Sequence, residues 1–298
     1  MLSARFKPWH VPLFLAKYAY LRARRRPVLV HFEVTMRCNA RCNFCDYWKT
    51  DASAKEHELK SFADAARRFN PMMITFTGGE PTLRRDLEDR VRAVCEAVTV
   101  KYVTVITHGA MLTPERAASL WAAGINQFNI SLDYLDGRHD VARGIPGLTA
   151  KIMGTIPKLH ERGIDNVRFN TVIKDDNLDQ IMPIVARAQE LRCGVNLSVY
   201  TDSKNGNKAH LLRDEQMAAV GTPLEEISRG RARQHSASRG AADVLNVDCV
   251  VTACLGALAR DVRQLLTVRG DCRRLNAPGE GQLGSAAQRC RRAGIRAR

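Results

Sequence analysis

The chain has 298 residues and a net charge of +15, from 46 Lys and Arg against 31 Asp and Glu. Its composition, 45% hydrophobic and 26% charged, excludes a wholly disordered chain and a small disulfide-stapled domain. No apolar run approaches the roughly 18–20 residues that a membrane-spanning helix needs. The nine cysteines form no even set, and in a chain this long they indicate reduced thiols or metal ligands, hence a cytoplasmic setting.

The N-terminal segment, residues 1–26, combines a short apolar stretch over 11–16 with a run of arginines, Arg22, Arg24, Arg25 and Arg26. A secretory signal would place its charge before the apolar part, so the segment instead predicts a basic amphipathic helix. Two interpretations stay open for this helix. It contacts a membrane surface peripherally, or it closes the bottom of the domain that follows.

Short β-branched segments then alternate six times with segments of helical period. Strands are predicted over 28–35, 72–77, 102–107, 127–133, 167–173 and 195–201, and helices over 58–69, 83–98, 113–123, 150–162 and 178–192. Thr113 before Pro114 predicts a helix start, and Gly163 and Gly194 predict helix ends. The alternation predicts an α/β fold, a partial TIM barrel of (βα)6 type, with its chemistry at the carboxyl ends of the strands.

The loop after the first predicted strand contains three cysteines, Cys38, Cys42 and Cys45, in C-x-x-x-C-x-x-C spacing. Three thiolates within eight residues can hold one iron–sulfur cluster. A structural zinc site usually has four ligands. The closest Cys or His downstream is His57, so zinc stays open only as an alternative.

With Phe44 before the third cysteine, this motif resembles that of the radical S-adenosylmethionine (radical SAM) superfamily. Further matches lie at the ends of later strands. T-G-G-E-P at 77–81 resembles the family's GGEP element, T-H-G at 107–109 is similar to its T-N-G, S-L-D at 131–133 matches its S-L-D, and Asn170 stands where related enzymes often have Asn. The resemblance covers residues 28–203 and gives a core domain over 27–208.

The resemblance implies a 4Fe–4S cluster on the three cysteines, with SAM bound to the open iron. The expected SAM-binding set is Phe44, Gly78, Gly79, Glu80, Thr107, Ser131, Asp133 and Asn170. In this set the glycines would bring backbone close to the methionine part, Glu80 would meet the ammonium group, and Phe44 would lie against the adenine. Structural alternatives stay open: a tight turn for the glycines, helix-end charge for Glu80, strand packing for Thr107 and Ser131, and a turn cap for Asp133.

The implied activity is reductive cleavage of SAM to methionine and a 5′-deoxyadenosyl radical that abstracts hydrogen from a substrate. The electron would come from a donor such as flavodoxin or ferredoxin. The substrate, a small molecule or a peptide, is not identified by the sequence, because fold alone does not give function. The alternative is a truncated or catalytically incomplete paralogue that binds the cluster without turnover.

The motifs are closest to the branch that contains molybdenum-cofactor cyclases and SPASM-type enzymes. The cyclases carry an Arg where this chain has Thr75, and His108 replaces the usual Asn of T-N-G. An auxiliary cluster would need the late cysteines, Cys249, Cys254, Cys272 and Cys290, but these include no C-x-x-C pair. Cys95 and Cys193 fall in helical patterns and are expected to be buried thiols.

The last 90 residues, 209–298, contain no aromatic residue and no Lys, yet hold 15 Arg, 15 Ala and 9 Gly. Such a segment is a poor source of packed core. We therefore expect a tail that is disordered or translated out of frame. Its arginines lack the interleaved aromatic residues that stack on bases, so the basic charge does not favour nucleic acid as a partner.

Overall fold

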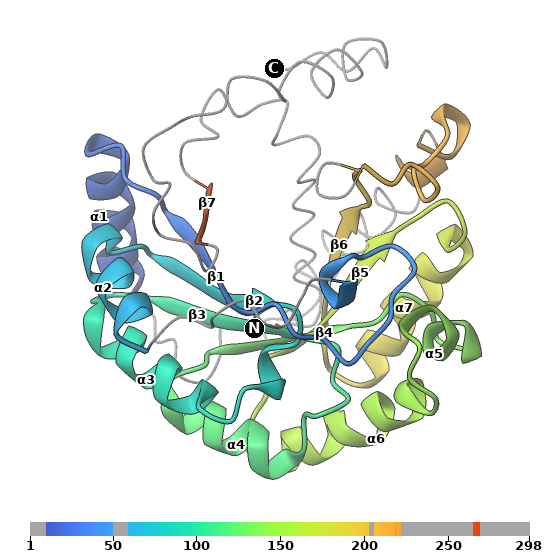
Figure 1. Cartoon of the computed structure of the whole chain (residues 1–298), viewed down its shortest axis with the longest axis horizontal. Helices are drawn as coiled ribbons and strands as arrows, with labels where there is room; N and C mark the ends of the chain where they lie inside the picture. The colour runs from blue at the N-terminus through green and yellow to red at the C-terminus, as the bar shows by residue number, and fades with distance from the viewer. Residues whose placement is uncertain (1–9, 50–58, 203–205, 218, 222–264, 269–298) are drawn as a thin grey trace, which may run out of the picture. The chain divides into compact units, whose positions relative to one another are not determined.

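The computed structural model describes residues 10–49, 59–202, 206–217, 219–221 and 265–268 (Figure 1). These residues fall into two compact units, each described by itself below. The first comprises the described residues up to Ser131, those from Asp136 to Arg168, and 265–268. The second comprises Leu132–Leu135 and the described residues from Phe169 onward, apart from 265–268. Among the described residues, no helix is long and apolar enough to cross a membrane.

A parallel sheet forms the centre of the first unit. Its strands lie side by side in chain order: β1 (Leu29–Thr35), β2 (Met73–Gly78), β3 (Tyr102–Thr107) and β4 (Gln127–Ser131). A further strand, β7 (Leu265–Val268), pairs in parallel with the other edge of β1. All these strands point the same way, so the loops that follow β1 to β4 leave from one edge of the sheet.

Among its described residues, the first unit also contains five helices that follow the N-terminal one: α2 (Leu59–Phe69), α3 (Leu87–Ala97), α4 (Pro114–Ala123), α5 (Gly137–Arg143) and α6 (Leu148–Glu161). Figure 1 shows α2, α3 and α4 along one face of β1 to β4. The rings of Phe32 and Phe62 meet edge to face at 5.5 Å, and Phe32 lies 5.9 Å from Phe76. These three side chains are buried and join β1, β2 and α2 in one apolar core.

The second unit contains most of β5 (Val167–Ile173), then η3 (Leu178–Gln180), α7 (Ile181–Glu190) and β6 (Gly194–Val199). Apolar side chains of α7 and β6 are buried, among them Ile184, Val185, Val195 and Leu197. This is again a strand, a crossover helix and a strand. The α/β fold with six strand–helix units predicted from the sequence is therefore confirmed.

Several boundaries differ from the prediction. The helix predicted over 83–98 is a short turn, η2 (Pro81–Leu83), followed by α3, and the one predicted over 178–192 divides into η3 and α7. Gly194 begins β6 instead of ending a helix, because Arg192 takes the left-handed turn (φ 52°) there. Thr113 caps α4 as predicted, with its side chain accepting from the N–H of Arg116. The helix α5 was not predicted from the sequence. The strand β7 lies within the segment 209–298, for which no strand was predicted.

The N-terminal helix α1 (His10–Ala23) packs at the amino ends of the strands. Its Lys17 donates to Oδ1 of Asn70 at 3.0 Å and to the carbonyl of Thr99, residues that precede β2 and β3. Leu21 is fully buried on the same side. This helix therefore lies at the end of the sheet opposite to the loops that follow β1 to β3.

Candidate active site

The loop after β1 contains all three motif cysteines. Cys42 is buried, Cys38 and Cys45 are half-buried, and no disulfide joins the cysteines that the structure describes. The N–H of Cys45 donates to the carbonyl of Cys42 at 3.3 Å, and Nε1 of Trp48 donates to the same carbonyl at 3.1 Å. Burial raises the pKa of Cys38 to about 11, so its thiolate needs a nearby positive charge such as a bound metal.

The two glycines after β2 lie against the start of this loop. A Cβ on Gly78 would be 2.3 Å from the carbonyl oxygen of Thr35, and one on Gly79 would be 2.1 Å from that of Arg37. The backbones are also bonded, from Gly79 to Thr35 at 2.7 Å and from Glu80 to Arg37 at 2.8 Å. Only glycine permits this approach. The close approach seen here is to the backbone of the cysteine loop.

Glu80 is 1% exposed, and both of its carboxylate oxygens accept hydrogen bonds. Oε1 accepts from the N–H of Thr82 at 3.0 Å and from the hydroxyl of Thr107 at 2.7 Å, while Oε2 accepts from the N–H of His108 at 2.8 Å. The carboxylate thus caps η2 and ties the end of β2 to the end of β3. The helix-end role left open for Glu80 is present in the structure.

His108 connects β3 to the cysteine loop. Its Nε2 lies 2.8 Å from Oδ1 of Asn39, and its Nδ1 accepts the N–H of Ala110 at 3.1 Å. A backbone N–H can only donate, so Nδ1 carries no proton and Nε2 donates to Asn39. Burial lowers the pKa of His108, although the charge of Glu80 acts in the opposite direction. The ring is therefore neutral near pH 7.

Arg143, the last residue of α5, places a positive charge beside the buried cysteine. Its Nη1 donates to Sγ of Cys42 at 3.7 Å, its guanidinium lies 5.1 Å from the ring centre of Phe44, and its carbonyl accepts from Arg41 at 2.8 Å. Phe44 is half-buried under this contact, and Arg143 is 7% exposed. Sequence reasoning missed Arg143 because 101 positions separate it from Cys42 and no local pattern marks it.

Ser131 and Thr107 are both buried at the carboxyl ends of their strands. Thr107 donates to Glu80 and accepts the N–H of Gly109 at 3.0 Å, so its hydroxyl is occupied within the protein. The first unit therefore joins the cysteine loop, Gly78 to Glu80, Thr107 and His108 through direct hydrogen bonds, with Ser131 at the end of the neighbouring strand β4.

Two predicted site residues belong to the second unit. Asp133 is fully buried, its Oδ1 accepts the N–H of Val172 at 2.9 Å, and its carbonyl accepts from Asn177 at 3.2 Å. The carbonyl of Asn170 accepts the N–H of Leu132 at 3.2 Å. Asp133 thus fastens the segment after β4 to the end of β5, a long-range role that differs from the cap of the following turn left open for it.

A buried lysine in the second unit was also missed. Lys174, directly after β5, donates to the hydroxyl of Tyr134 at 2.9 Å and lies 3.8 Å from a carboxylate oxygen of Asp176. Its side chain is fully buried, and its ammonium is 4.6 Å from the ring centre of Tyr134. A Lys that ends a β-branched strand gives no signal of such burial in the sequence.

A cavity of about 350 Å³ in the first unit is lined by Arg37, which directly precedes the first motif cysteine in the chain, and by Leu83, Arg84, Arg85 and Asp86. The guanidinium of Arg84 donates two hydrogen bonds to the carboxylate of Asp86, from Nε to Oδ1 at 2.8 Å and from Nη2 to Oδ2 at 2.9 Å. Hydrogen bonds from Arg84, and then from Arg90, hold the pKa of Asp86 well below its usual range. The lining is therefore predominantly positive.

Residues 32–188 match the Radical SAM superfamily, a match that spans the cysteine loop and the ends of β2 to β5. Among curated relatives, the probable GTP 3′,8-cyclase of Thermoplasma volcanium is 33% identical over 191 residues, which are 62% of this chain and 57% of that protein. The GTP 3′,8-cyclase of Ectopseudomonas mendocina is 26% identical over 267 residues, covering 87% and 78%. The chain spans little more than half the length of the first of these relatives.

Among solved structures, Streptococcus suis SuiB bound to S-adenosylmethionine aligns with a TM-score of 0.64 at 16% identity, over 85% of this chain and 61% of that one. At this identity the likeness shows the fold alone, and it agrees with the partial TIM barrel predicted. The motif cysteines, the glycine turn that packs on their loop, and the profile match over more than half of the sequence lead to one conclusion: the chain belongs to the radical SAM superfamily.

Proposed function

We propose that the chain is a radical SAM enzyme that binds a 4Fe–4S cluster through Cys38, Cys42 and Cys45 and uses SAM to abstract hydrogen from a substrate. The observation that carries the proposal is the packing of Gly78 and Gly79 on the cysteine loop, which unites the two defining motifs at one edge of the sheet. The same edge is where α/β proteins of this class collect their chemistry.

The residues present fit an iron–sulfur cluster. One short loop supplies three cysteine sulfurs, and thiolates are the usual ligands of iron–sulfur clusters. The guanidinium of Arg143 at Sγ of Cys42 offsets the negative charge that bound thiolates carry. When bound, the cluster would supply one electron to the sulfonium of SAM, which splits into methionine and a 5′-deoxyadenosyl radical.

The chain's own residues would bind and orient SAM. We assign Phe44 to the adenine of SAM, and Ser131 to the carboxylate or ribose of SAM. Thr107 already donates its hydroxyl proton to Glu80, so it would reach the carboxylate only by giving up that bond, or would accept from a ribose hydroxyl. Glu80 would meet the ammonium group through Oε2, which accepts from the N–H of His108 and keeps a second acceptor position, while Thr82 and Thr107 already donate to Oε1. Asp133 and Asn170 belong to the second unit, and Asp133 would act by holding the backbone of Val172.

The proposed substrate is a small molecule or a peptide. GTP is the specific candidate favoured by the relatives named GTP 3′,8-cyclase. Thr75 stands where the cyclase branch of the motif carries an Arg; it is buried and accepts a hydrogen bond from the hydroxyl of Thr104 at 3.0 Å. The proposed electron donor is a one-electron carrier such as flavodoxin or ferredoxin. The proposed location of the reaction is the cytoplasm.

The test is anaerobic reconstitution with iron and sulfide, followed by dithionite and SAM. We expect an iron–sulfur absorption and EPR signal, and production of 5′-deoxyadenosine. Cys42→Ala should lose both, whereas Cys95→Ala, which changes a half-buried cysteine on α3, should keep both. A cluster without any 5′-deoxyadenosine would instead identify a catalytically incomplete paralogue, and stoichiometric zinc would identify a structural zinc protein.

The substrate arm adds GTP to the same reaction. Conversion of GTP with hydrogen transfer to 5′-deoxyadenosine would assign the cyclase activity to this chain. If 5′-deoxyadenosine forms at a rate that GTP leaves unchanged, the substrate is another molecule, and the loss of the cyclases' Arg at Thr75 explains the difference.

A further inference from the structure

The helix α1 has its polarity reversed relative to an ordinary surface helix. Its only charged side chain between residues 11 and 21, Lys17, is buried against the domain. Its outward side carries eight exposed residues between 11 and 20, and none of them is charged: Val11, Pro12, Leu13, Leu15, Ala16, Tyr18, Ala19 and Tyr20. A surface helix normally turns its apolar stripe inward and its charges outward.

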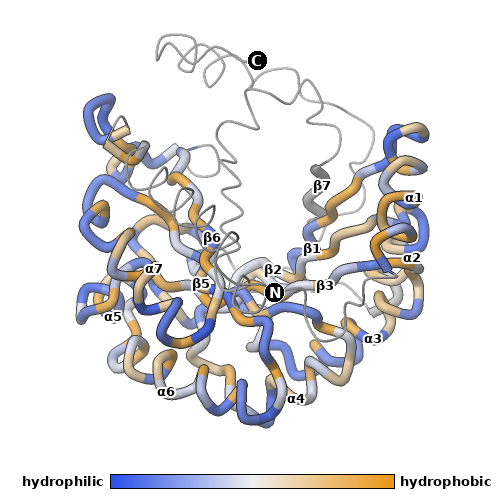
Figure 2. The backbone as a smooth tube through the Cα atoms, turned by 180° about the vertical axis from the view of Figure 1, so that it is seen from behind, coloured by the Kyte–Doolittle hydropathy of each residue, from blue (hydrophilic) through white to orange (hydrophobic). Residues whose placement is uncertain are grey.

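Exposure of the larger side chains is substantial. Leu15 is 63% exposed and Leu13 is 52% exposed, while Val11, Tyr18 and Tyr20 each exceed 40%. Val11, Leu15 and Tyr18 follow one another at i, i+4 and i+7, so they form a continuous stripe along the helix. Figure 2 shows hydrophobic residues along α1. An apolar surface of this extent marks a site of contact with an apolar partner.

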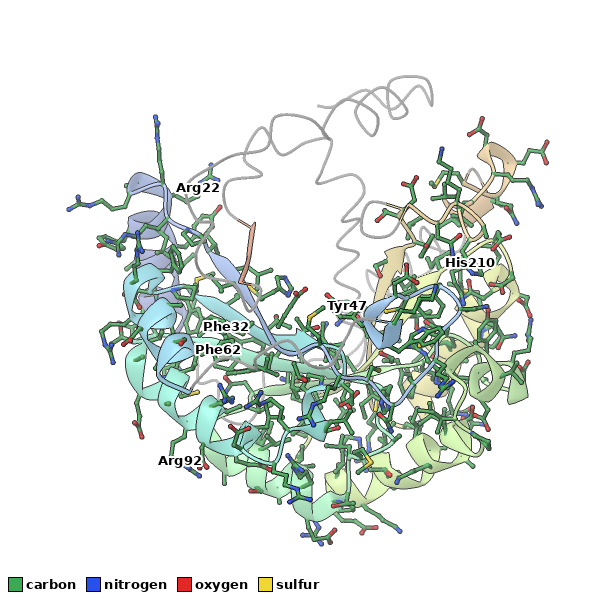
Figure 3. The ribbon with its side chains drawn as sticks, viewed as in Figure 1. Arg22, Phe32, Tyr47, Phe62, Arg92 and His210 are labelled. Atoms are coloured by element: carbon green, nitrogen blue, oxygen red, sulfur yellow. The ribbon has the colours of Figure 1, made fainter. Side chains whose placement is uncertain are left out.

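Positive charge follows at the end of the same helix. Arg22, Arg24 and Arg25 are exposed, and the guanidinium of Arg24 lies 6.0 Å from the ring centre of Tyr20. Figure 3 labels Arg22 at this end of α1. The helix itself contains no Asp or Glu. Apolar side chains, two tyrosines and a terminal group of arginines match the depth profile of a bilayer surface, where tyrosines occupy the headgroup level and arginines meet lipid phosphates.

We propose that the outward face of α1 docks the protein on the surface of an anionic lipid bilayer, with the helix lying in the plane of the interface. Fourteen residues give a helix of about 21 Å, too short to span the membrane. The occupant is lipid and not a second copy of the chain, because the face offers no acidic residue to pair with the arginines of a partner helix. Anionic headgroups supply that charge.

The position of α1 is compatible with the proposed chemistry. Lys17 fixes the helix to Asn70 and Thr99, at the amino ends of β2 and β3. The cysteine loop leaves the opposite, carboxyl end of β1. Docking through α1 would therefore leave the cysteine loop facing away from the bilayer and open to an electron donor. The inference goes beyond the proposed function and does not depend on it.

The experiment is co-sedimentation of the full chain with phosphatidylcholine vesicles that contain or lack phosphatidylglycerol. We expect binding to the anionic vesicles that weakens as salt rises. The paired change Leu15→Glu with Tyr18→Glu should reduce vesicle binding roughly tenfold or more, since it places charge in the apolar region. Arg24→Glu with Arg25→Glu should abolish the preference for anionic lipid.

Matched controls use exposed residues of other helices in the same unit. Val141→Glu changes an 82% exposed apolar residue of α5, and Arg92→Glu changes an exposed arginine of α3. Both should bind vesicles like the original chain. Circular dichroism and thermal melting of every variant separate a docking defect from misfolding, and we expect no loss of fold because the test residues are exposed.

Three outcomes would overturn the proposal. The first is no binding of the folded, unaltered chain to anionic vesicles at low salt. The second is equal loss of binding in Val141→Glu and in the α1 variants. The third is a dimer in gel filtration that the α1 variants dissociate without any vesicle binding, which would make this face a subunit interface. None of these outcomes affects the assay for 5′-deoxyadenosine, so the two proposals fail independently.

Discussion

The guanidinium of Arg143 donates to the sulfur of Cys42 at 3.7 Å, and both side chains are buried. The contact joins the end of α5 to the cysteine loop, together with the bond from the N–H of Arg41 to the carbonyl of Arg143. A positive charge and a hydrogen bond at a ligand sulfur are among the means by which proteins set the reduction potential of iron–sulfur clusters.

Replacing Arg143 should therefore make a cluster at this loop harder to reduce. Arg143→Gln removes the charge that favours the reduced, more negative state, so the midpoint potential should fall. A tenfold loss in the equilibrium constant for one-electron reduction corresponds to about 59 mV. A titration with dithionite, followed by EPR, measures the midpoint potential. The control is Arg138→Gln, which changes an exposed residue of the same helix. An unchanged potential combined with weaker SAM binding would show that Arg143 acts on SAM.

The packing of Gly79 on the cysteine loop gives a second prediction. Gly79→Ala would place a methyl group 2.1 Å from the carbonyl oxygen of Arg37, so the loop must move. We expect loss of most iron on reconstitution and a fall of about 1–3 kcal/mol in the free energy of unfolding, the usual cost of overpacking. Iron analysis and urea unfolding check both.

Gly154→Ala is the matched control for that change. Gly154 lies inside α6, and nothing stands within 4 Å of an added Cβ. Alanine there should raise the free energy of unfolding by about 0.5–1 kcal/mol, because glycine in a helix interior carries an entropic cost. If Gly79→Ala keeps as much iron as Gly154→Ala and the original chain, the loop tolerates the added methyl group, and the close-packing argument is wrong.

The role of Asp133 can be decided by a pair of substitutions. Asp133→Asn keeps an oxygen that accepts the N–H of Val172, whereas Asp133→Ala leaves that N–H without its partner. We expect the alanine variant to lose about 1–3 kcal/mol of stability and the asparagine variant to lose little. If Asp133→Asn keeps its stability but binds SAM poorly, the carboxylate contacts SAM directly.

Lys17 should make stability depend on alkaline pH. Burial lowers the pKa of Lys17 from 10.5 to about 8, and the nearby charge of Lys101 acts in the same direction. The unfolded chain therefore binds the proton more tightly than the folded chain. Burying the charged ammonium group therefore lowers the free energy of unfolding. This loss of stability is fully present below pH 8 and disappears as the pH rises from about 8 to 10.5.

The measurement compares urea unfolding of the original chain and of Lys17→Met across this pH range. The original chain should gain stability relative to the variant between pH 8 and 10.5. Parallel curves would show that the ammonium group carries no burial penalty. Lys101→Gln serves as a second comparison, and it should shift the lower limit of the transition upward, because it removes a repelling charge.

Much of the fold followed from local pattern. The spacing of the apolar residues indicates which segments are strands and which are helices, and β3 and β5 have the predicted bounds. Thr113 before Pro114 is a local helix-start signal, and Thr113 caps α4 as predicted. The segments that departed from prediction were those in which a turn within the pattern broke a helix, as at η2 and η3. The segment 209–298 was marked by composition alone, and apart from 209–217, 219–221 and 265–268 it lies outside the described residues.

The sequence by itself determined the family motifs, because three closely spaced cysteines and two adjacent glycines are local features of one loop and one turn. Tertiary structure alone decided what those residues touch. Arg143 reaches Cys42 across 101 positions, the glycines pack on the cysteine loop, and Lys17 turns inward and leaves an apolar face on α1. Such pairings depend on how distant elements dock, and a hydrogen bond between segments far apart in the chain leaves no periodicity to detect.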